Sequence, residues 1–353
     1  MRSRPGVAVD LGTVNTLVSV GGFLVEEPSA IAVHRHTGTI EGVGRAADAL
    51  AEKDPLDIEI IHPVRDGAIA DFDAAVVMLQ AFLRRARLPR GFARPLAVVC
   101  VPGGATPLER RSLAAVMAAA LPRSVLQFID KPVAVAAGAG LDLAPGAGAV
   151  VVDVGGGTTE VAMLAGGHIV RARSLRVGGN AMDQAIAQAL RAELGLLIGR
   201  DAARKLKMTL GLGYEATRET EIAGVDAARR TPRVERVSAD LVGNSLQSSA
   251  AAIMGAVRDL LANIPPNLAE DVVRGKIRLA GGGALLPGLA GRIELAAGIP
   301  AYVVDDPTRC VIRGATEILQ YGHEASGLRG DETPAPRTAP AVSRGDAAAG
   351  NAG

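Results

Sequence analysis

The sequence predicts an α/β protein made of two related halves, each built around a sheet and each carrying an insertion. At 353 residues the chain can form more than one domain with its own core. A short motif, made of an apolar strand, an aspartate, a glycine turn and a second strand, occurs twice, at residues 7–20 and 150–164. The order of strand-like and helix-like runs that follows the first copy begins again at the second. We therefore expect a duplicated β-β-β-α-β-α-β-α unit.

The first half begins with three strands and continues with alternating helices and strands. Apolar runs of strand length lie at residues 6–10, 15–20 and 29–33. The runs that follow predict helices near 74–87, 107–121 and 132–141 and strands at 96–101 and 125–129. Residues 34–66 interrupt this order and are predicted to be an insertion.

The second half starts after a glycine- and proline-rich joint at residues 144–149. A helix at 181–194 is predicted with Asn180 as its N-cap, and the run 239–263 predicts one long helix. An insertion falls at about 195–237. The other predicted elements are strands at 149–153, 158–164, 168–172, 277–280 and 300–304 and helices at 286–297 and 311–322.

Composition excludes several classes of function. The 38 basic and 37 acidic residues nearly balance and Trp is absent, so neither a nucleic-acid surface nor a base-stacking platform is indicated. Cys100 and Cys310 are the only cysteines and the five histidines show no HExxH spacing, so no disulfide framework or zinc cluster is expected. The chain shows neither a signal-peptide core nor an apolar run of membrane length, which favours a reducing cytoplasm.

The repeated motif is suited to holding a phosphate. Asp10 precedes the turn at Gly12 and Thr13, and Asp153 precedes the glycines 155–157. Glycines let backbone N–H groups approach an anion because no Cβ blocks them, and the carboxylate is placed to hold Mg²⁺ through water. Two such turns facing each other predict a nucleotide clamped between two domains. The alternative is two ordinary glycine-rich hairpins, against which the shared aspartate offset argues.

A series of motifs carries a family resemblance from about residue 6 to 322. They are, in order, DLGTVNTLV, EEPSAIAV, HPVRDGAIADFD, VVCVPGGATPLERR, AAGAGL, VVDVGGGTTEVA, SLRVGGNAMDQAI, LLIG, IPPNLAED, LAGGGALLPGL and DDPTRCV. In these the chain resembles the actin-like ATPases, and within them the MreB family of bacterial rod-shape proteins. GGGTT alone indicates the wider superfamily, which also contains sugar kinases and chaperones. RVGGNAMDQAI and GGGALLPGL together are specific to the MreB family.

The resemblance implies an actin-like ATPase fold, in which two duplicated ribonuclease-H-like domains flank an ATP cleft. The implied subdomains are IA at 1–33 and 67–143, IB at 34–66, IIA at 144–178 and 238–323, and IIB at 179–237, with a disordered tail at 324–353. It also implies homopolymeric filaments on the inner face of the cell membrane. Such filaments guide cell-wall synthesis with cell-wall elongation proteins as partners, and nucleic acid is not among them.

The resemblance also assigns residues to a site for ATP and Mg²⁺. The phosphates would be contacted by Gly12, Thr13, Val14 and Asn15 on one side and by Gly155, Gly156, Gly157 and Thr158 on the other. The metal would lie between Asp10 and Asp153, held through water. Adenosine would be bordered by Arg204, Lys207, Gly282, Gly283, Ala284 and Leu285. A tight strand-to-helix turn is the alternative account of the glycines at 281–283.

The chain departs from the family at a catalytic position. The family pattern reads I-E-E-P, with its second Glu positioning the attacking water, whereas this chain has Asp130 and Lys131 before Pro132. An ammonium cannot accept a proton from water and would instead pair with phosphate oxygens. We therefore expect slow or absent hydrolysis. The alternative is that Lys131 points to solvent and Asp130 takes over the role.

A second departure lies in the stretch that the family writes A-E-E-I-K. Here Arg204 replaces the first Glu, whose carboxylate would accept from ribose hydroxyls, while Lys207 keeps the last position. Because a guanidinium only donates, sugar contacts should weaken or rearrange. Two changes in one pocket suggest a divergent paralogue that acts through assembly.

A short basic and apolar tip suggests contact with a membrane surface. Leu88 and Phe92 lie among arginines that include Arg90 and Arg94. An apolar wedge amid cations suits an anionic lipid surface, and in the family a small hydrophobic loop at this place inserts into the bilayer. The alternative is a solvated basic loop with Phe92 in the core.

Other functions of the superfamily fit the sequence less well. A small-molecule kinase or another non-polymerising ATPase is the main alternative to a filament protein, but a kinase needs a carboxylate base and a substrate pocket, and neither can be identified. A chaperone needs an attached peptide-binding domain. The MreB-type motifs disfavour an actin homologue of pili or division.

Overall fold

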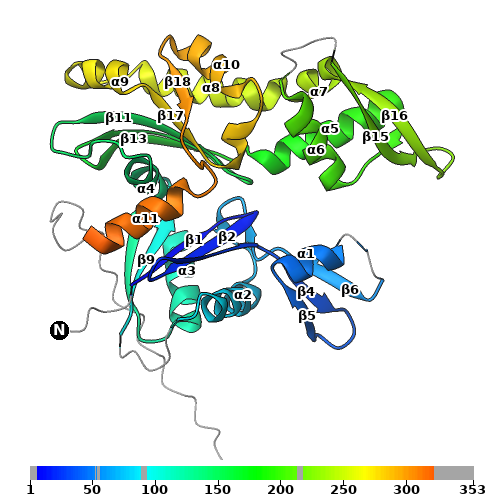
Figure 1. Ribbon diagram of the computed structural model, residues 1–353, viewed down its shortest axis with the longest axis horizontal. Coiled ribbons are helices and arrows are strands. Elements are labelled where there is room, and N and C mark those ends of the chain that lie inside the picture. Colours follow the sequence, from blue (N-terminus) through cyan, green and yellow to red (C-terminus); the bar gives the residue numbers. More distant parts are fainter. Residues whose placement is uncertain (1–5, 52, 54–55, 89–93, 213–217, 322–353) are drawn as a thin grey trace, which may run out of the picture.

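The structure, a computed structural model, describes residues 6–51, 53, 56–88, 94–212 and 218–321 (Figure 1). The predicted tail at 324–353 lies outside these ranges. Among the helices that the structure describes, none is both long enough and apolar enough to cross a membrane.

The first half is built on a five-stranded sheet in the order β10-β9-β1-β2-β3. Strands β1, β2 and β3 are antiparallel neighbours, whereas β9 runs parallel to both β1 and β10. The strands are β1 (Gly6–Leu11), β2 (Asn15–Val20), β3 (Phe23–Pro28), β9 (Leu96–Val101) and β10 (Val125–Asp130).

The second half repeats this topology in a sheet of the order β13-β12-β11-β17-β18. Three antiparallel strands are again followed by two parallel ones. The strands are β11 (Gly148–Val154), β12 (Thr159–Ala165), β13 (His168–Leu175), β17 (Ile277–Ala280) and β18 (Ala301–Val303). The predicted duplicated α/β architecture is confirmed.

The predicted position of the third strand in the first half is wrong. The third strand of the sheet is β3, not residues 29–33, because Gly21 and Gly22 adopt φ of +56° and +85° and turn the chain straight back after β2. The predicted run instead forms β4 (Ile31–His34), which pairs with β5 (Ile40–Val43) and β6 (Ile58–Ile61) in a separate sheet.

Helices α4 (Lys131–Gly138) and α11 (Cys310–Tyr321) lie between the two sheets (Figure 1). Alternate strand residues face opposite layers, so that Val151 packs in the central core with these helices and Val150 packs in the outer core of the second half. The helices approach very closely at Gly138 and Gly314, where added Cβ atoms would lie 2.1 Å from Cys310 O and 1.9 Å from Ala134 O. The centre of the molecule therefore depends on two glycines.

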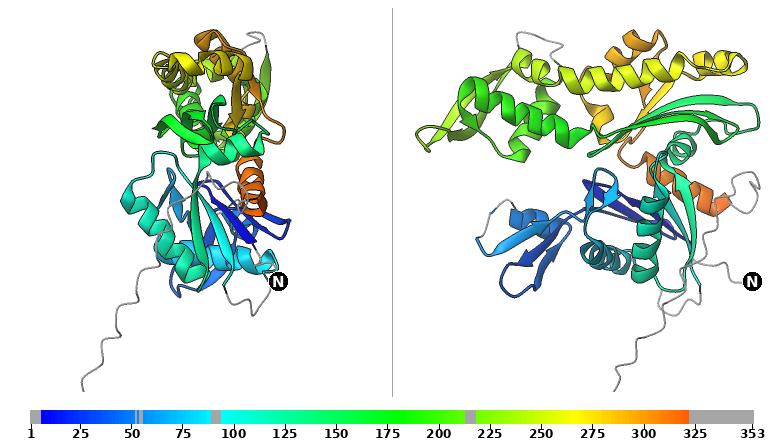
Figure 2. Two further views of the ribbon diagram at one scale, coloured as in Figure 1. Left: turned by 90° about the vertical axis from the view of Figure 1, so that its left-hand side faces the viewer. Right: turned by 180° about the vertical axis from the view of Figure 1, so that it is seen from behind.

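Five other helices cover the outer faces of the two main sheets (Figure 2). The first sheet is covered by α2 (Phe72–Arg85) and α3 (Pro107–Ala120), and the second by α8 (Gln247–Leu261), α9 (Ala269–Gly275) and α10 (Leu289–Ala297). The helix predicted at 239–263 is two helices, α7 (Ala239–Ser245) and α8. Ser245 Oγ donates to Val242 O at 2.7 Å where the two helices meet, and such side-chain bonding to the backbone often bends helices.

Each half carries an insertion, and both extend toward the same end of the molecule (Figure 1). The first combines the β4-β5-β6 sheet with α1 (Arg45–Ala51). The second combines α5 (Gly179–Leu194), α6 (Arg200–Leu210) and α7 with a sheet of β14 (Leu196–Leu197), β15 (Glu219–Asp226) and β16 (Pro232–Ser238). The short elements are β7 (Val64–Arg65), β8 (Ala68–Ile69), η1 (Pro266–Leu268) and η2 (Gly282–Leu285).

Candidate functional site

The turns of the two repeated hairpins touch each other across the halves. A Cβ on Gly156 would lie 2.1 Å from Val14 Cγ2, and one on Gly157 would lie 2.7 Å from Thr13 Oγ1. Only glycine allows this approach, which gives both glycines a packing role. The structure thus brings together the two turns to which the sequence assigned phosphate binding.

The facing turns leave backbone donors free. Within the described ranges, the N–H groups of Thr13, Val14, Gly156 and Gly157 form no backbone–backbone hydrogen bond. Backbone N–H groups grouped in turns form concavities that favour anions. The geometry is therefore suited to a phosphate chain.

Surrounding residues hold both turns in place. Ser29 Oγ donates to Gly12 O at 2.6 Å, and Ser29 N donates to Val14 O at 2.8 Å. On the other side, Gly179 N donates to Gly155 O at 3.0 Å. These hydrogen bonds fix the shape of each turn before any ligand binds.

Beneath the turns lies a cluster of three carboxylates and one ammonium. Asp10, Asp153 and Glu160 are buried, and Lys131 exposes 14% of its side chain. Lys131 Nζ lies 2.9 Å from Asp10 Oδ1, and the two groups form an ion pair. Burial alone would lower the pKa of Lys131, but the three carboxylates outweigh it and raise that pKa above its usual value. The ammonium therefore stays charged at neutral pH.

Two of these carboxylates bind their protons more tightly than usual. Burial raises the pKa of Asp153 to about 6 and that of Glu160 to about 7, although Lys131 acts against both shifts. Glu160 Oε2 also accepts a hydrogen bond of 2.8 Å from Gly103 N. Sequence reasoning missed Glu160, whose signal was a lone acidic residue in the otherwise apolar strand after the second glycine turn.

The cluster does not fit Mg²⁺. The sequence predicted water-mediated binding between Asp10 and Asp153, yet the Lys131 ammonium occupies the cationic position beside Asp10. Two cations competing for one carboxylate repel each other.

Asp130, the other candidate catalytic residue, is engaged elsewhere. Arg110 Nη2 donates to Asp130 Oδ1 at 2.5 Å. The carboxylate of Asp130 is thus engaged in an ion pair with α3. Lys131 and Asp130 are adjacent in sequence, but the former pairs with Asp10 and the latter with α3.

A cleft of about 740 Å³ lies beside the first turn, between the two insertions. Three arginines line it, namely Arg65, Arg200 and Arg204, together with three aspartates, Asp48, Asp66 and Asp201. Thr13, Val14, Asn15 and Asn180 form part of its wall. Its volume is that of a small-molecule site. Arg65 and Arg200 were not among the sequence candidates.

The adenosine candidates fall into different surroundings. Arg204 is exposed and lies 3.9 Å from Asp201 within α6, whereas Lys207 is buried. Lys207 Nζ contacts Asp183 Oδ1 at 2.6 Å and donates to Gly179 O at 2.9 Å. Lys207 thus braces the backbone that supports the second glycine turn.

The glycine turn after β17 approaches the carboxylate cluster. Gly281 has φ of +80°, and a Cβ there would lie 2.5 Å from Asp153 Oδ1. Of the four candidates that follow, which form η2, Ala284 is buried and Leu285 is exposed. The turn therefore packs directly against Asp153 at the floor of the site.

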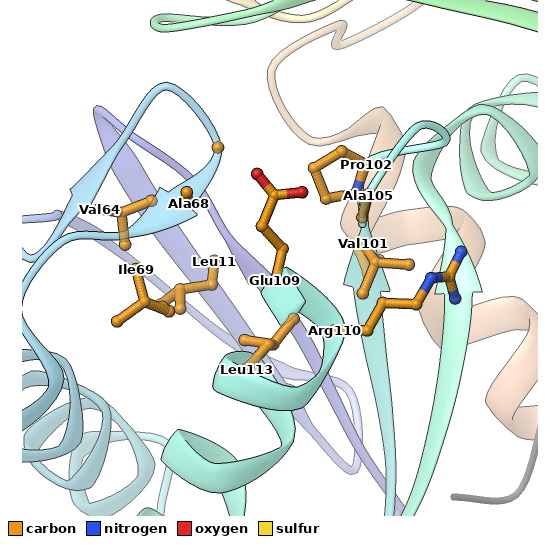
Figure 3. Close-up of a pocket in the computed structure, with 12 residues that line it drawn as sticks. Leu11, Val64, Ala68, Ile69, Val101, Pro102, Ala105, Glu109, Arg110 and Leu113 are labelled. Carbon is orange, nitrogen blue, oxygen red and sulfur yellow. The ribbon is translucent and has the colours of Figure 1, made fainter. Parts of the chain in front are cut away.

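A smaller cavity of about 20 Å³ lies at the start of α3, and its lining residues are drawn in Figure 3. Leu11, Val64 and Ile69 lie on one side, Val101 on the other, and Glu109 points between them (Figure 3). This volume suffices for about one water molecule. The cavity is too small to hold a nucleotide.

The predicted membrane tip is only partly described. Leu88 is partly buried against the core of the first half and Arg94 is exposed. Arg90 and Phe92 lie outside the described residues.

Comparisons with known proteins match nearly the whole chain. The MreB/Mbl protein family matches residues 4–326. The cell shape-determining protein MreB of Escherichia coli (strain K12) is 37% identical over 324 residues, which cover 89% of this chain and 93% of that protein. The cell shape-determining protein Mbl of Bacillus subtilis (strain 168) is 31% identical over 317 residues, covering 89% and 95%.

Solved structures agree with this assignment. The crystal structure of MreB5 of Spiroplasma citri bound to ADP has a TM-score of 0.84 and 31% identity, covering 92% of this chain and 99% of that one. The duplicated sheets, the paired glycine turns and the matched length all point to one family. The chain belongs to the MreB/Mbl family of actin-like proteins.

Proposed function

We propose that this protein is a nucleotide-binding, filament-forming bacterial actin homologue that acts in cell shape and cell-wall synthesis. The observation that carries the proposal is the contact between two glycine turns with free N–H groups, beside a cleft that residues 13–15 of the first turn line. MreB5 of Spiroplasma citri has been solved with ADP and with AMPPNP, which supports an adenine nucleotide as the ligand. A kinase role lacks support, since the relatives named above are cell shape-determining proteins.

We assign the phosphates to the two turns and the adenosine to the region between α6 and η2. Hydrolysis is proposed to be slow or lost, because Lys131 cannot accept a proton and Asp130 is held by Arg110. The proposed subdomains are those of the sequence analysis. The proposed site of action is the inner face of the cell membrane, alongside cell-wall elongation proteins.

The full-length protein is expected to form filaments with ATP and with AMPPNP alike. A nucleotide that bridges both turns would close the halves, and closure rather than cleavage would present the assembly surfaces. Sedimentation and electron microscopy with ATP, AMPPNP and no nucleotide test this. Filaments with ATP alone would assign assembly to hydrolysis, and a protein that stays monomeric under all conditions, with and without lipid, would refute the filament role.

The full-length protein is also expected to float with anionic liposomes and to lose this binding in high salt, because arginines and one apolar wedge act together. The variant Arg90→Ala, Phe92→Ala, Arg94→Ala should bind clearly less. Arg229→Ala, Arg230→Ala, which removes exposed arginines from the β15–β16 turn, is the control. Equal flotation of the triple variant and the wild type would place membrane contact elsewhere.

A further inference from the structure

The Lys131 ammonium is fixed at the floor of the candidate nucleotide site. Lys131 is the first residue of α4 and is followed by Pro132, which restricts the backbone there. A helix N-terminus disfavours a positive charge, so the carboxylates rather than the helix account for the position of this side chain. The side chain runs inward, and Nζ ends 2.9 Å from Asp10 Oδ1.

This position is the one that a water linking Asp10 to Mg²⁺ would need, since Mg²⁺ usually keeps several of its waters. Mg²⁺ demands near-ideal octahedral geometry with oxygen ligands at about 2.0–2.1 Å. An ammonium within contact of the same carboxylate oxygen crowds that shell and repels the ion. Moving the side chain away would leave the charge in a largely buried cluster without its partner, which is costly.

The ammonium can serve the phosphates in place of a metal. An ammonium has three N–H donors, and the contact with Asp10 uses one of them. The other donors and the charge remain for phosphate oxygens entering between the turns. Like a bound metal, the group then joins a carboxylate of the first half to the phosphate chain.

We propose that this chain binds its nucleotide without a divalent cation, with the Lys131 ammonium as the built-in counter-ion. The proposal rests on the proposed nucleotide binding and deepens it. The proposal predicts that the metal dependence of nucleotide binding changes when the charge of residue 131 changes. Lys131→Glu lowers the formal charge of the site by two units, which equals the charge of one Mg²⁺. The variant should therefore depend on a metal that the wild type does not need.

Calorimetric titration of the full-length protein with ATP and ADP, in excess EDTA and in excess Mg²⁺, tests the proposal. For the wild type, the dissociation constants in the two conditions should agree within about threefold. For Lys131→Glu, binding in EDTA should be weaker than in Mg²⁺ by about 30-fold or more, because carboxylates then face the phosphates. Electron paramagnetic resonance with Mn²⁺ should detect protein-bound metal in the nucleotide complex of the variant but not of the wild type.

Two control variants keep the result interpretable. Lys53→Glu makes the same charge change at an exposed position of the first insertion and should behave as the wild type. Lys131→Gln removes the ammonium with little change in length, and should weaken binding in EDTA even if Lys131→Glu does not fold.

The outcomes separate this inference from the proposed function. Wild-type binding that is equal in EDTA and Mg²⁺ supports both. Wild-type binding in Mg²⁺ that disappears in EDTA overturns the inference and leaves nucleotide binding intact. Absence of wild-type binding in both conditions overturns the proposed function and the inference with it.

Discussion

Replacing Gly314 by alanine should destabilise the protein by about 3 kcal/mol or more, at the upper end of what overpacking costs. The added Cβ would lie 1.9 Å from Ala134 O and 2.6 Å from Gly138 N, and both are backbone atoms of the neighbouring helix. A backbone cannot move aside as a flexible side chain does. Because α4 and α11 lie between the two sheets, relief of the clash requires both halves to shift.

Chemical denaturation of the full-length protein measures this effect. Gly255→Ala is the matched control, since Gly255 lies inside α8 and an added Cβ there would have no atom of another segment within 4 Å. That variant should gain about 0.5–1 kcal/mol, because alanine loses less backbone entropy in a helix. If Gly314→Ala is as stable as the wild type, the close packing of α4 on α11 is refuted.

The sequence predicted most of the central architecture because local patterns dictate it. The strand from Val150 to Val154 is continuously apolar apart from Asp153, which is typical of a strand buried on both faces. The repeated aspartate and glycine motif correctly indicated the duplication. The order of elements in each half followed from the same periodicities.

Features set by contacts between distant segments were not predictable in the same way. The pattern of residues 29–33 predicts a strand, and most of these residues form β4. Which sheet this strand joins depends on its pairing with β5 and β6, which the local pattern does not show. Gly138 and Gly314 carry no local signal either. Their importance arises only where two helices far apart in sequence cross.

The candidate site shows the same division. Asp10, Asp153 and the glycine turns were recognisable from spacing, and the Lys131 substitution stood out against the family motif. The partner of Lys131 was not foreseen, since the prediction had the ammonium facing phosphate oxygens whereas it also pairs with Asp10. Glu160 and Arg110 were missed because their roles depend on a neighbour brought close by folding.

Replacing Lys131 by glutamate should raise the rate of phosphate release from ATP by about 100-fold or more, when Mg²⁺ is supplied. A carboxylate at the end of this side chain can accept a proton from water, which the ammonium cannot do, and a positioned acid or base typically contributes about 10²–10⁴-fold. Release should be measured at saturating ATP, so that weaker binding does not mask the gain.

Lys131→Gln separates the two explanations for a gain in rate. It removes the ammonium but supplies no proton acceptor, so phosphate release should stay near the wild-type rate. If Lys131→Gln accelerates release as much as Lys131→Glu, then the ammonium blocks the reaction and no missing base needs to be invoked. If the wild type already releases phosphate as fast as Lys131→Glu, another residue of the cleft activates water, and Glu160, whose pKa burial raises to about 7, is the first to substitute. In that case Glu160→Gln should abolish turnover in the wild type, because a neutral amide cannot take the proton.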